Sequence, residues 1–204
     1  MHDRPFPFRV RRGTVIVVSA ELLLRGLSAR VTWPETGGND GAPAVAVVLA
    51  DDALALDLCA IAGMVVLAPA RGPALPADAA TAVRWAADHA AELGADPRRV
   101  LVAGAGAAGL AAAATALVAR DDGWPRLVRQ VLVWPVLSLP GGPSVQPREG
   151  VAPATILCSR EERDDGRWYA RRLRAVGVEV VELQRGSVAQ LARSLRATLA
   201  RRSG

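Results

Sequence analysis

Short apolar runs alternate along this chain with longer stretches of helical character. From Ala44 onward, the runs predict strands at Ala44 to Ala50, Met64 to Pro69, Val100 to Ala103, Leu127 to Leu137, Ala154 to Cys158 and Val178 to Leu183. The stretches between them predict helices at about Asp52 to Ala62, Ala77 to Leu93, Ala107 to Arg120, Asp164 to Ala175 and about Val188 to Arg201. Such alternation indicates an α/β fold, with a mostly parallel, twisted sheet and helices on both faces.

The N-terminal part has a different pattern. Three apolar or alternating stretches, Phe8 to Arg12, Thr14 to Val18 and Leu27 to Trp33, predict strands without helices between them. A turn-rich connection follows from Glu35 to Pro43. With no internal repeat and no linker long enough to separate two bodies, we expect residues 1–204 to form a single domain.

Three glycines stand where the predicted strand at Val100 meets an alanine-rich helix. This sequence, VLVAGAGAAGLAAAA, contains Gly104, Gly106 and Gly109 and has the frame of a G-x-S-x-G nucleophile elbow. The five elbow positions are Gly104, Ala105, Gly106, Ala107 and Ala108, and Gly109 follows them. Gly106 therefore occupies the position of the nucleophile and has no side chain to attack a substrate.

The surrounding sequence resembles the bacterial hormone-sensitive-lipase-like esterases of the α/β-hydrolase superfamily. The similar features are an Arg-Trp pair, the segment AELGADPRR before the elbow strand, and WPVL where the family has YPVL. The resemblance implies an α/β-hydrolase core of about eight strands, with antiparallel entry strands at the N-terminus. The family's cap segment would fall between Ser138 and Pro153, but these sixteen residues are rich in Gly and Pro. We therefore expect no cap domain.

The resemblance also assigns the family's functional positions in this chain. The nucleophile falls on Gly106, the acid on Arg160 and the base on Ala189. The oxyanion loop, HGGG in the family, falls on Asp51, Asp52 and Ala53. We expect Arg160 and Ala189 on loops at the same edge of the sheet as Gly106, with Arg160 in solvent or paired with one of the carboxylates Glu161, Glu162, Asp51 and Asp52.

The histidines support the same interpretation. The chain has two, His2 and His89, and both precede the elbow, whereas the base follows the nucleophile in this fold. We expect His89 on the solvent side of its helix. These residues predict a pseudo-hydrolase with a binding, scaffolding or regulatory role, including association with an active relative. The alternatives are altered ester chemistry at Asp51, Asp52, Ser159 or Cys158, and a decaying paralogue without a selected function.

The same glycines also spell G-x-G-x-x-G, the pattern of dinucleotide-binding sites. A ribose-binding acid would stand at the end of the next strand, but Asp121 and Asp122 precede that strand. Two histidines and two cysteines, with no C-x-x-C or H-x-x-x-H pattern, give little basis for a zinc site. We therefore expect no cofactor and no metal, and we interpret the Asp51–Asp52 and Asp164–Asp165 pairs as helix caps.

Charge and cysteine content narrow the expected partners and compartment. All 25 basic residues are arginine, which is typical of a high-GC bacterial genome, and the net charge is +5. Because no nucleic-acid motif accompanies the arginines, we expect a solvated basic face rather than nucleic-acid binding. Two buried cysteines, and a polar N-terminus without an apolar signal segment, predict a cytoplasmic protein that binds no membrane. The edge of the last strand, Val178 to Leu183, is the predicted contact for a partner protein or a second copy.

Overall fold

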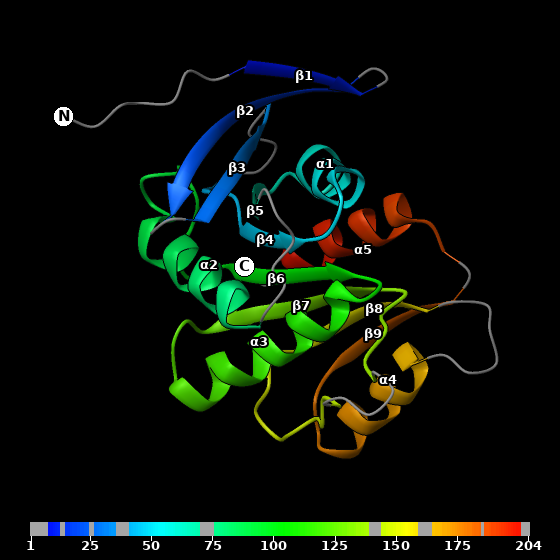
Figure 1. Cartoon of the computed structure of the whole chain (residues 1–204). Coiled ribbons are helices and arrows are strands. Elements are labelled where there is room, and N and C mark those ends of the chain that lie inside the picture. Colours follow the sequence, from blue (N-terminus) through cyan, green and yellow to red (C-terminus); the bar gives the residue numbers. More distant parts are fainter. Residues whose placement is uncertain are drawn as a thin grey trace.

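One continuous sheet organises the molecule (Figure 1). The computed structural model describes residues 8–12, 15–24, 27–35, 41–69, 76–138, 144–158, 165–184 and 186–200. The strands are β1 (Phe8–Arg12), β2 (Val15–Leu24), β3 (Leu27–Pro34), β4 (Val45–Leu49), β5 (Val65–Pro69), β6 (Val100–Ala105), β7 (Leu127–Val133), β8 (Ala154–Cys158) and β9 (Val180–Gln184). Their order is β1-β2-β3-β5-β4-β6-β7-β8-β9, and the described residues thus form nine strands where about eight were expected.

The pairing directions divide the sheet into two parts. The strands β1, β2 and β3 pair antiparallel, and β3 pairs antiparallel with β5. From β5 through β4, β6, β7 and β8 to β9 every pairing is parallel. The carboxyl ends of these six strands therefore meet at one edge of the sheet, which is where ligands bind in open α/β sheets.

The described residues form five helices. These helices cover both faces of the sheet (Figure 1). They are α1 (Asp52–Ala60), α2 (Pro76–His89), α3 (Ala108–Asp122), α4 (Asp165–Ala175) and α5 (Val188–Ala200). Buried residues of α2, α3 and α4 share one hydrophobic core with the sheet, and those of α1 and α5 share the other. The predicted arrangement of helices on both faces is confirmed.

Small side chains allow close packing on the face that carries α2 and α3. The strands β4, β5 and β8 are buried along their whole length, as the continuous apolar runs predict for strands covered on both faces. The buried positions of α3 are five alanines together with Gly109 and Thr115. A helix lined by alanine can approach the sheet and its neighbour closely, because no long side chain intervenes.

Several predicted boundaries differ from the structure. The strand β2 extends to Leu24 rather than ending at Val18, and β7 ends at Val133, two residues before Pro135, rather than at Leu137. The second helix ends at His89 rather than Leu93, because the chain turns there and Gly94 has a φ of +72°. The last strand begins at Val180 rather than Val178, because the Val178 N–H donates to the Leu173 carbonyl 2.9 Å away and closes the end of α4. Within the described part of the chain, none of the helices combines the length and apolarity required to cross a bilayer.

Candidate functional site

The elbow has the predicted geometry of strand, sharp turn and helix. Gly106 follows β6 and has a φ of +54°, in the left-handed region that favours glycine. Its N–H donates to the Val133 carbonyl at 3.0 Å, and its carbonyl accepts from Val136 at 2.9 Å and from Gly109 at 3.0 Å. Backbone hydrogen bonds thus tie the turn to the last residue of β7 and to Val136 just beyond it.

The other two elbow glycines are required by packing. A Cβ at Gly104 would lie 2.7 Å from the Ala108 carbonyl carbon and 2.9 Å from the Ala112 Cβ. A Cβ at Gly109 would lie 2.7 Å from the Pro135 Cβ. Real Cβ atoms do not approach other atoms so closely. The three glycines of the G-x-G-x-x-G pattern therefore each have a structural explanation that involves no dinucleotide.

The helix that begins at the elbow has no side-chain cap. Its N-cap is Ala107, and the first turn is closed only by backbone bonds such as that from Leu110 to Ala107 at 3.2 Å. In α/β-hydrolases the N–H of the residue after the nucleophile is one donor of the oxyanion hole. Ala107 holds that position here and is exposed, next to the partly buried elbow residues Ala105 and Ala108.

The predicted oxyanion segment forms a direct connection between a strand and a helix. Leu49, the last residue of β4, pairs in register with Gly104, so Asp51, Asp52 and Ala53 lie at the same sheet edge as the elbow. Asp51 is the N-cap of α1, and its Oδ1 accepts from the Leu54 N–H at 3.2 Å. Asp52 and Ala53 already belong to the helix. The cap prediction is confirmed for Asp51, and only two residues separate β4 from α1.

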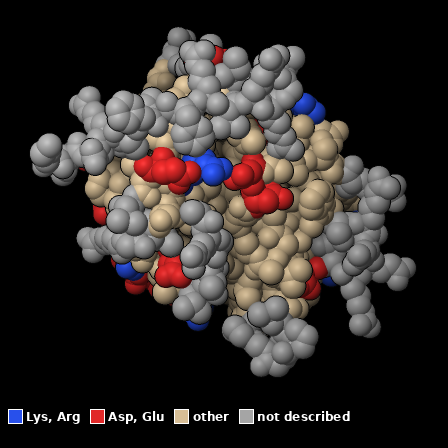
Figure 2. Space-filling model, turned by 45° about the horizontal axis from the view of Figure 1, so that its top comes forward, with Lys and Arg blue, Asp and Glu red and all other residues tan. Residues whose placement is uncertain are grey.

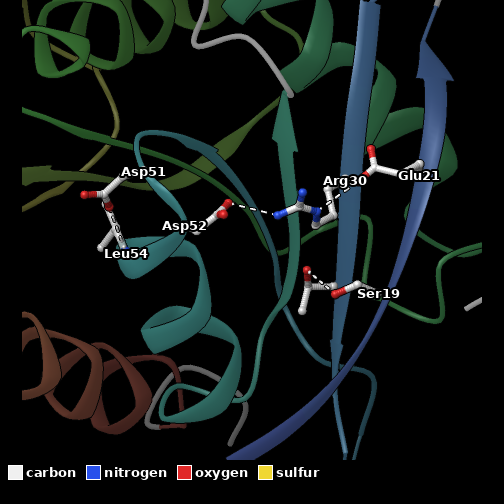
Figure 3. Close-up of polar contacts among 7 residues, drawn as sticks. Ser19, Glu21, Arg30, Asp51, Asp52 and Leu54 are labelled. Atoms are coloured by element: carbon white, nitrogen blue, oxygen red, sulfur yellow. Dashed lines mark hydrogen bonds and ion pairs between the residues drawn. The ribbon is translucent and has the colours of Figure 1, made fainter. Parts of the chain in front are cut away.

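Asp52 is held by an arginine from the antiparallel strands (Figure 3). Arg30 on β3 donates from Nη1 to Asp52 Oδ1 at 3.0 Å and from Nε to Glu21 Oε1 on β2 at 2.9 Å. The hydrogen bond to Glu21 is the largest cause that raises the pKa of Arg30. Figure 2 shows a short surface row in which basic atoms lie between two acidic groups. The sequence offered Asp52 as a partner for Arg160, and its partner here is Arg30.

The predicted base position is in a helix. Ala189 is the second residue of α5 and partly buried, so its predicted place on a loop is wrong. The reason is a capping box that starts the helix directly after β9. The Gln190 N–H donates to Ser187 Oγ at 3.2 Å, and the Ser187 N–H donates to Gln190 Oε1 at 2.8 Å. Arg160, the predicted acid position, lies outside the described residues, as do Ser159 and Asp164.

His89 and the cysteines have structural surroundings. The His89 ring stacks on Trp85 with centroids 4.3 Å apart, and its Nδ1 lies 2.9 Å from the Trp85 carbonyl oxygen. The side chain is therefore partly buried rather than fully on the solvent side. Cys59 and Cys158 are free and buried, as predicted, and burial raises the pKa of the Cys59 thiol to about 12. A thiol with that pKa is protonated at neutral pH and does not act as a nucleophile.

Two features near this edge, at Trp134 and at Asp165, were not predicted from the sequence. Trp134 follows β7 with a φ of +43° and is 48% exposed. Asp165 is the first residue of α4, and its Oδ2 accepts from the backbone N–H groups of Leu137 at 2.7 Å and Ser138 at 3.2 Å. It thereby fixes the connection where the family has a cap segment. The Trp-Pro pair directly after an apolar strand was the available signal for a constrained residue at Trp134.

A comparison with known proteins agrees with this geometry. Carboxylesterase NlhH of Mycobacterium tuberculosis is 34% identical over 147 residues, which cover 50% of this chain and 46% of that protein. Esterase LipI of the same organism is 41% identical over 98 residues, covering 48% of this chain and 30% of that protein. The chain thus matches less than half the length of either relative.

Solved structures extend the similarity to most of the chain. An esterase from Pyrobaculum calidifontis superposes with a TM-score of 0.75 at 25% identity, covering 90% of this chain and 85% of that one. A family profile described as the alpha/beta hydrolase fold matches residues 45–150, which include β4, the elbow and the connection after β7. This match covers more than half of the sequence, and the chain therefore belongs to the α/β-hydrolase fold family.

Proposed function

We propose that this protein is a non-catalytic member of the α/β-hydrolase family that acts by binding. The observation that carries the proposal is the elbow, where Gly106 has the positive φ of the turn and no side chain. Ester hydrolysis by this fold requires a nucleophile whose proton is taken by a positioned base. A glycine at the centre of an otherwise regular elbow keeps the fold and omits the first reactant.

The two other positions support the same proposal. A base at residue 189 would extend from the first turn of α5, where the capping box of Ser187 and Gln190 leaves no loop to carry it. The connection after β4 is too short for a glycine loop, and its two acids are engaged with Leu54 and Arg30. Loss of a single oxyanion donor lowers turnover by roughly 100- to 1000-fold.

Altered ester chemistry finds little support in the groups considered for it. Cys158 is buried, Asp51 serves as a helix cap, and Ser159 lies outside the described residues. Asp52 is paired with Arg30. Two relatives are named carboxylesterase and esterase. By the family resemblance, the nucleophile and the base of such an enzyme fall on Gly106 and Ala189 of this chain. We therefore do not transfer that activity to this protein.

A binding role requires a surface for the partner. The strand β9 ends the sheet, and its partly buried side chains include Val180, Val181 and Leu183. An unpaired strand edge can add a strand from another chain. We propose this edge as the contact for an active relative or a second copy. The two free cysteines fit a reducing compartment such as the cytoplasm.

The proposal is tested with p-nitrophenyl acetate and p-nitrophenyl butyrate. The purified wild-type protein and its Gly106→Ser variant should both give rates equal to the buffer background, because the serine would have no base to take its proton. An active carboxylesterase assayed in parallel serves as the positive control. Saturable turnover by the wild type that survives further purification would contradict the proposal. So would robust turnover by Gly106→Ser, since it would require an unidentified base.

A further inference from the structure

A cavity of about 910 Å³ lies at the opposite edge of the parallel sheet from the elbow. It opens where the chain enters β6, β7 and β8, beside the end of α3. Its lining residues are Pro97, Arg98, Ala116, Ala119, Arg120, Gly123, Trp124, Pro125, Arg126, Leu127, Val128, Gly150, Val151, Ala152 and Pro153. The volume falls within the range of small-molecule sites, about 300 to 1,000 Å³.

The lining is basic. It contains three arginines and, although acids lie nearby, no Asp or Glu. Arg120 is engaged with Asp121 and with the Glu149 carbonyl oxygen. In contrast, the guanidinium groups of Arg98 and Arg126 have no hydrogen bond or ion pair within the described part of the chain. Two cationic groups with free donors therefore face a shared cavity.

Two of the neighbouring acids are already engaged with other arginines. Asp121 is paired with Arg120 and Arg148, and Asp122 is paired with Arg84. The backbone that carries Arg98 is fixed, because its N–H donates to Asp96 Oδ1 at 2.8 Å. The Arg98 side chain thus extends from a constrained turn, so less conformational entropy is lost when an anion binds.

Trp124 adds an aromatic wall to the cavity. The residue is 46% exposed, although an indole is usually buried. Its Nε1–H donates to Asp88 Oδ1 at 3.3 Å, which restricts how the ring can turn. Alanine and proline side chains, with Leu127 and Val151, complete the apolar part of the lining. An exposed, oriented indole can pack against an aromatic ring, and free guanidinium groups can bind an anionic group. Together they suit a ligand that is both aromatic and negatively charged.

We propose that this cavity binds a small aromatic anion, with a carboxylate or phosphate group held by Arg98 and Arg126 and a ring packed against Trp124. Because the cavity lies at the amino ends of the strands, the site is separate from the elbow and does not depend on ester chemistry. The arginine donors match either anion, since both present oxygens to a planar fork of N–H groups. The apolar lining selects against inorganic ions.

The test is isothermal titration of the full chain with 1-naphthyl phosphate and 1-naphthoate. We expect saturable binding of at least one of the two, and binding at least tenfold weaker for the neutral 1-naphthol and for inorganic phosphate. Trp124→Ala, Arg98→Gln and Arg126→Gln should each raise the Kd about tenfold, the effect of losing one charge-assisted or stacking contact. Arg126→Lys should retain part of the affinity through its charge.

Matched controls separate the site from general effects. Trp134→Ala removes an equally exposed tryptophan at the other edge, and Arg171→Gln removes an exposed arginine from α4. Both should bind as the wild type does, and circular dichroism checks that all variants are folded. The proposal is overturned if neither anion binds at millimolar concentration, or if 1-naphthol binds as tightly as the anions. It is also overturned if the control variants weaken binding as much as the cavity variants.

Discussion

Two kinds of strand-to-helix junction lie at the carboxyl edge of this sheet. The β6–α3 elbow has no side-chain cap, contains a positive-φ glycine and is packed so tightly that two further positions accept only glycine. The β4–α1 and β9–α5 junctions are short turns whose helices begin with the side-chain caps Asp51 and Ser187. All three lie where the family resemblance of the sequence leads us to expect the nucleophile, the oxyanion loop and the base.

The difference shows that packing determines the elbow, whereas helix capping determines the other two junctions. The elbow persists without a nucleophile because Gly104 and Gly109 let α3 lie against β6 and Pro135. Nothing comparable requires a long loop after β4 or β9. At those two junctions, capped helix starts satisfy the backbone donors with the fewest residues.

The largest expected effect comes from filling the elbow. Gly104→Ala places a Cβ against the Ala108 backbone, which cannot move without shifting α3. We expect the free energy of unfolding to fall by about 3 kcal/mol, measured by urea denaturation. Gly63→Ala is the control, because Gly63 has a φ of +70° with open space around it. This variant should lose only about 1 kcal/mol of unfolding free energy. Equal losses for the two variants would show that packing at the elbow is loose.

The cap of α1 should have a smaller effect. Asp51→Ala removes the acceptor for the Leu54 N–H, and we expect a loss of about 1 kcal/mol in urea denaturation. Asp51→Asn keeps an acceptor and should lose far less. If Asp51→Ala were neutral, the junction would owe its conformation to the surrounding contacts rather than to the cap.

The capping box of α5 can be measured as a pair. Ser187→Ala and Gln190→Ala each remove one of two reciprocal hydrogen bonds, so each should lower stability by about 0.5 to 1 kcal/mol. A double-mutant cycle of unfolding free energies should show that the two losses are not additive. Additive losses would mean that the two side chains act separately.

The smallest expected effect is at Arg30. Its partners Glu21 and Asp52 have side chains 51% and 73% exposed, so Arg30→Gln should lower stability by only about 0.5 kcal/mol. The loss should shrink in 1 M NaCl, because salt screens exposed ion pairs. Asp52→Asn, which leaves the Glu21 pair intact, should have a smaller effect. A large loss independent of salt would indicate that Arg30 acts through packing.

The sequence predicted much of the fold because its local signals agree. Continuous apolar runs identified buried strands such as β4 and β8, and the glycine pattern located the elbow at Gly106. Ser187 and Gln190 are three positions apart, the spacing of a capping box, and this spacing indicates a helix start at Ser187. The family resemblance implied a loop at the same place. Ala189 was misplaced for that reason.

Contacts between distant parts of the chain were harder to predict. Arg30 and Asp52 are 22 positions apart and meet because β3 and α1 lie together in the fold. Arg129 is 1% exposed in β7 and donates to the Ala154 carbonyl at 3.1 Å and to Glu179 at 2.7 Å. The run LVRQVLV shows only that two polar residues interrupt an apolar strand, and their partners belong to other elements.

The short connection between Leu49 and Asp52 also limits how this chain could change. One substitution at Gly106 would supply a hydroxyl, and single substitutions are frequent events in a lineage. A donor loop after β4 would instead need residues inserted between Leu49 and the α1 cap at Asp51. A route toward ester hydrolysis thus involves a change in chain length as well as a change of residue, and a hydroxyl at residue 106 would not supply it alone.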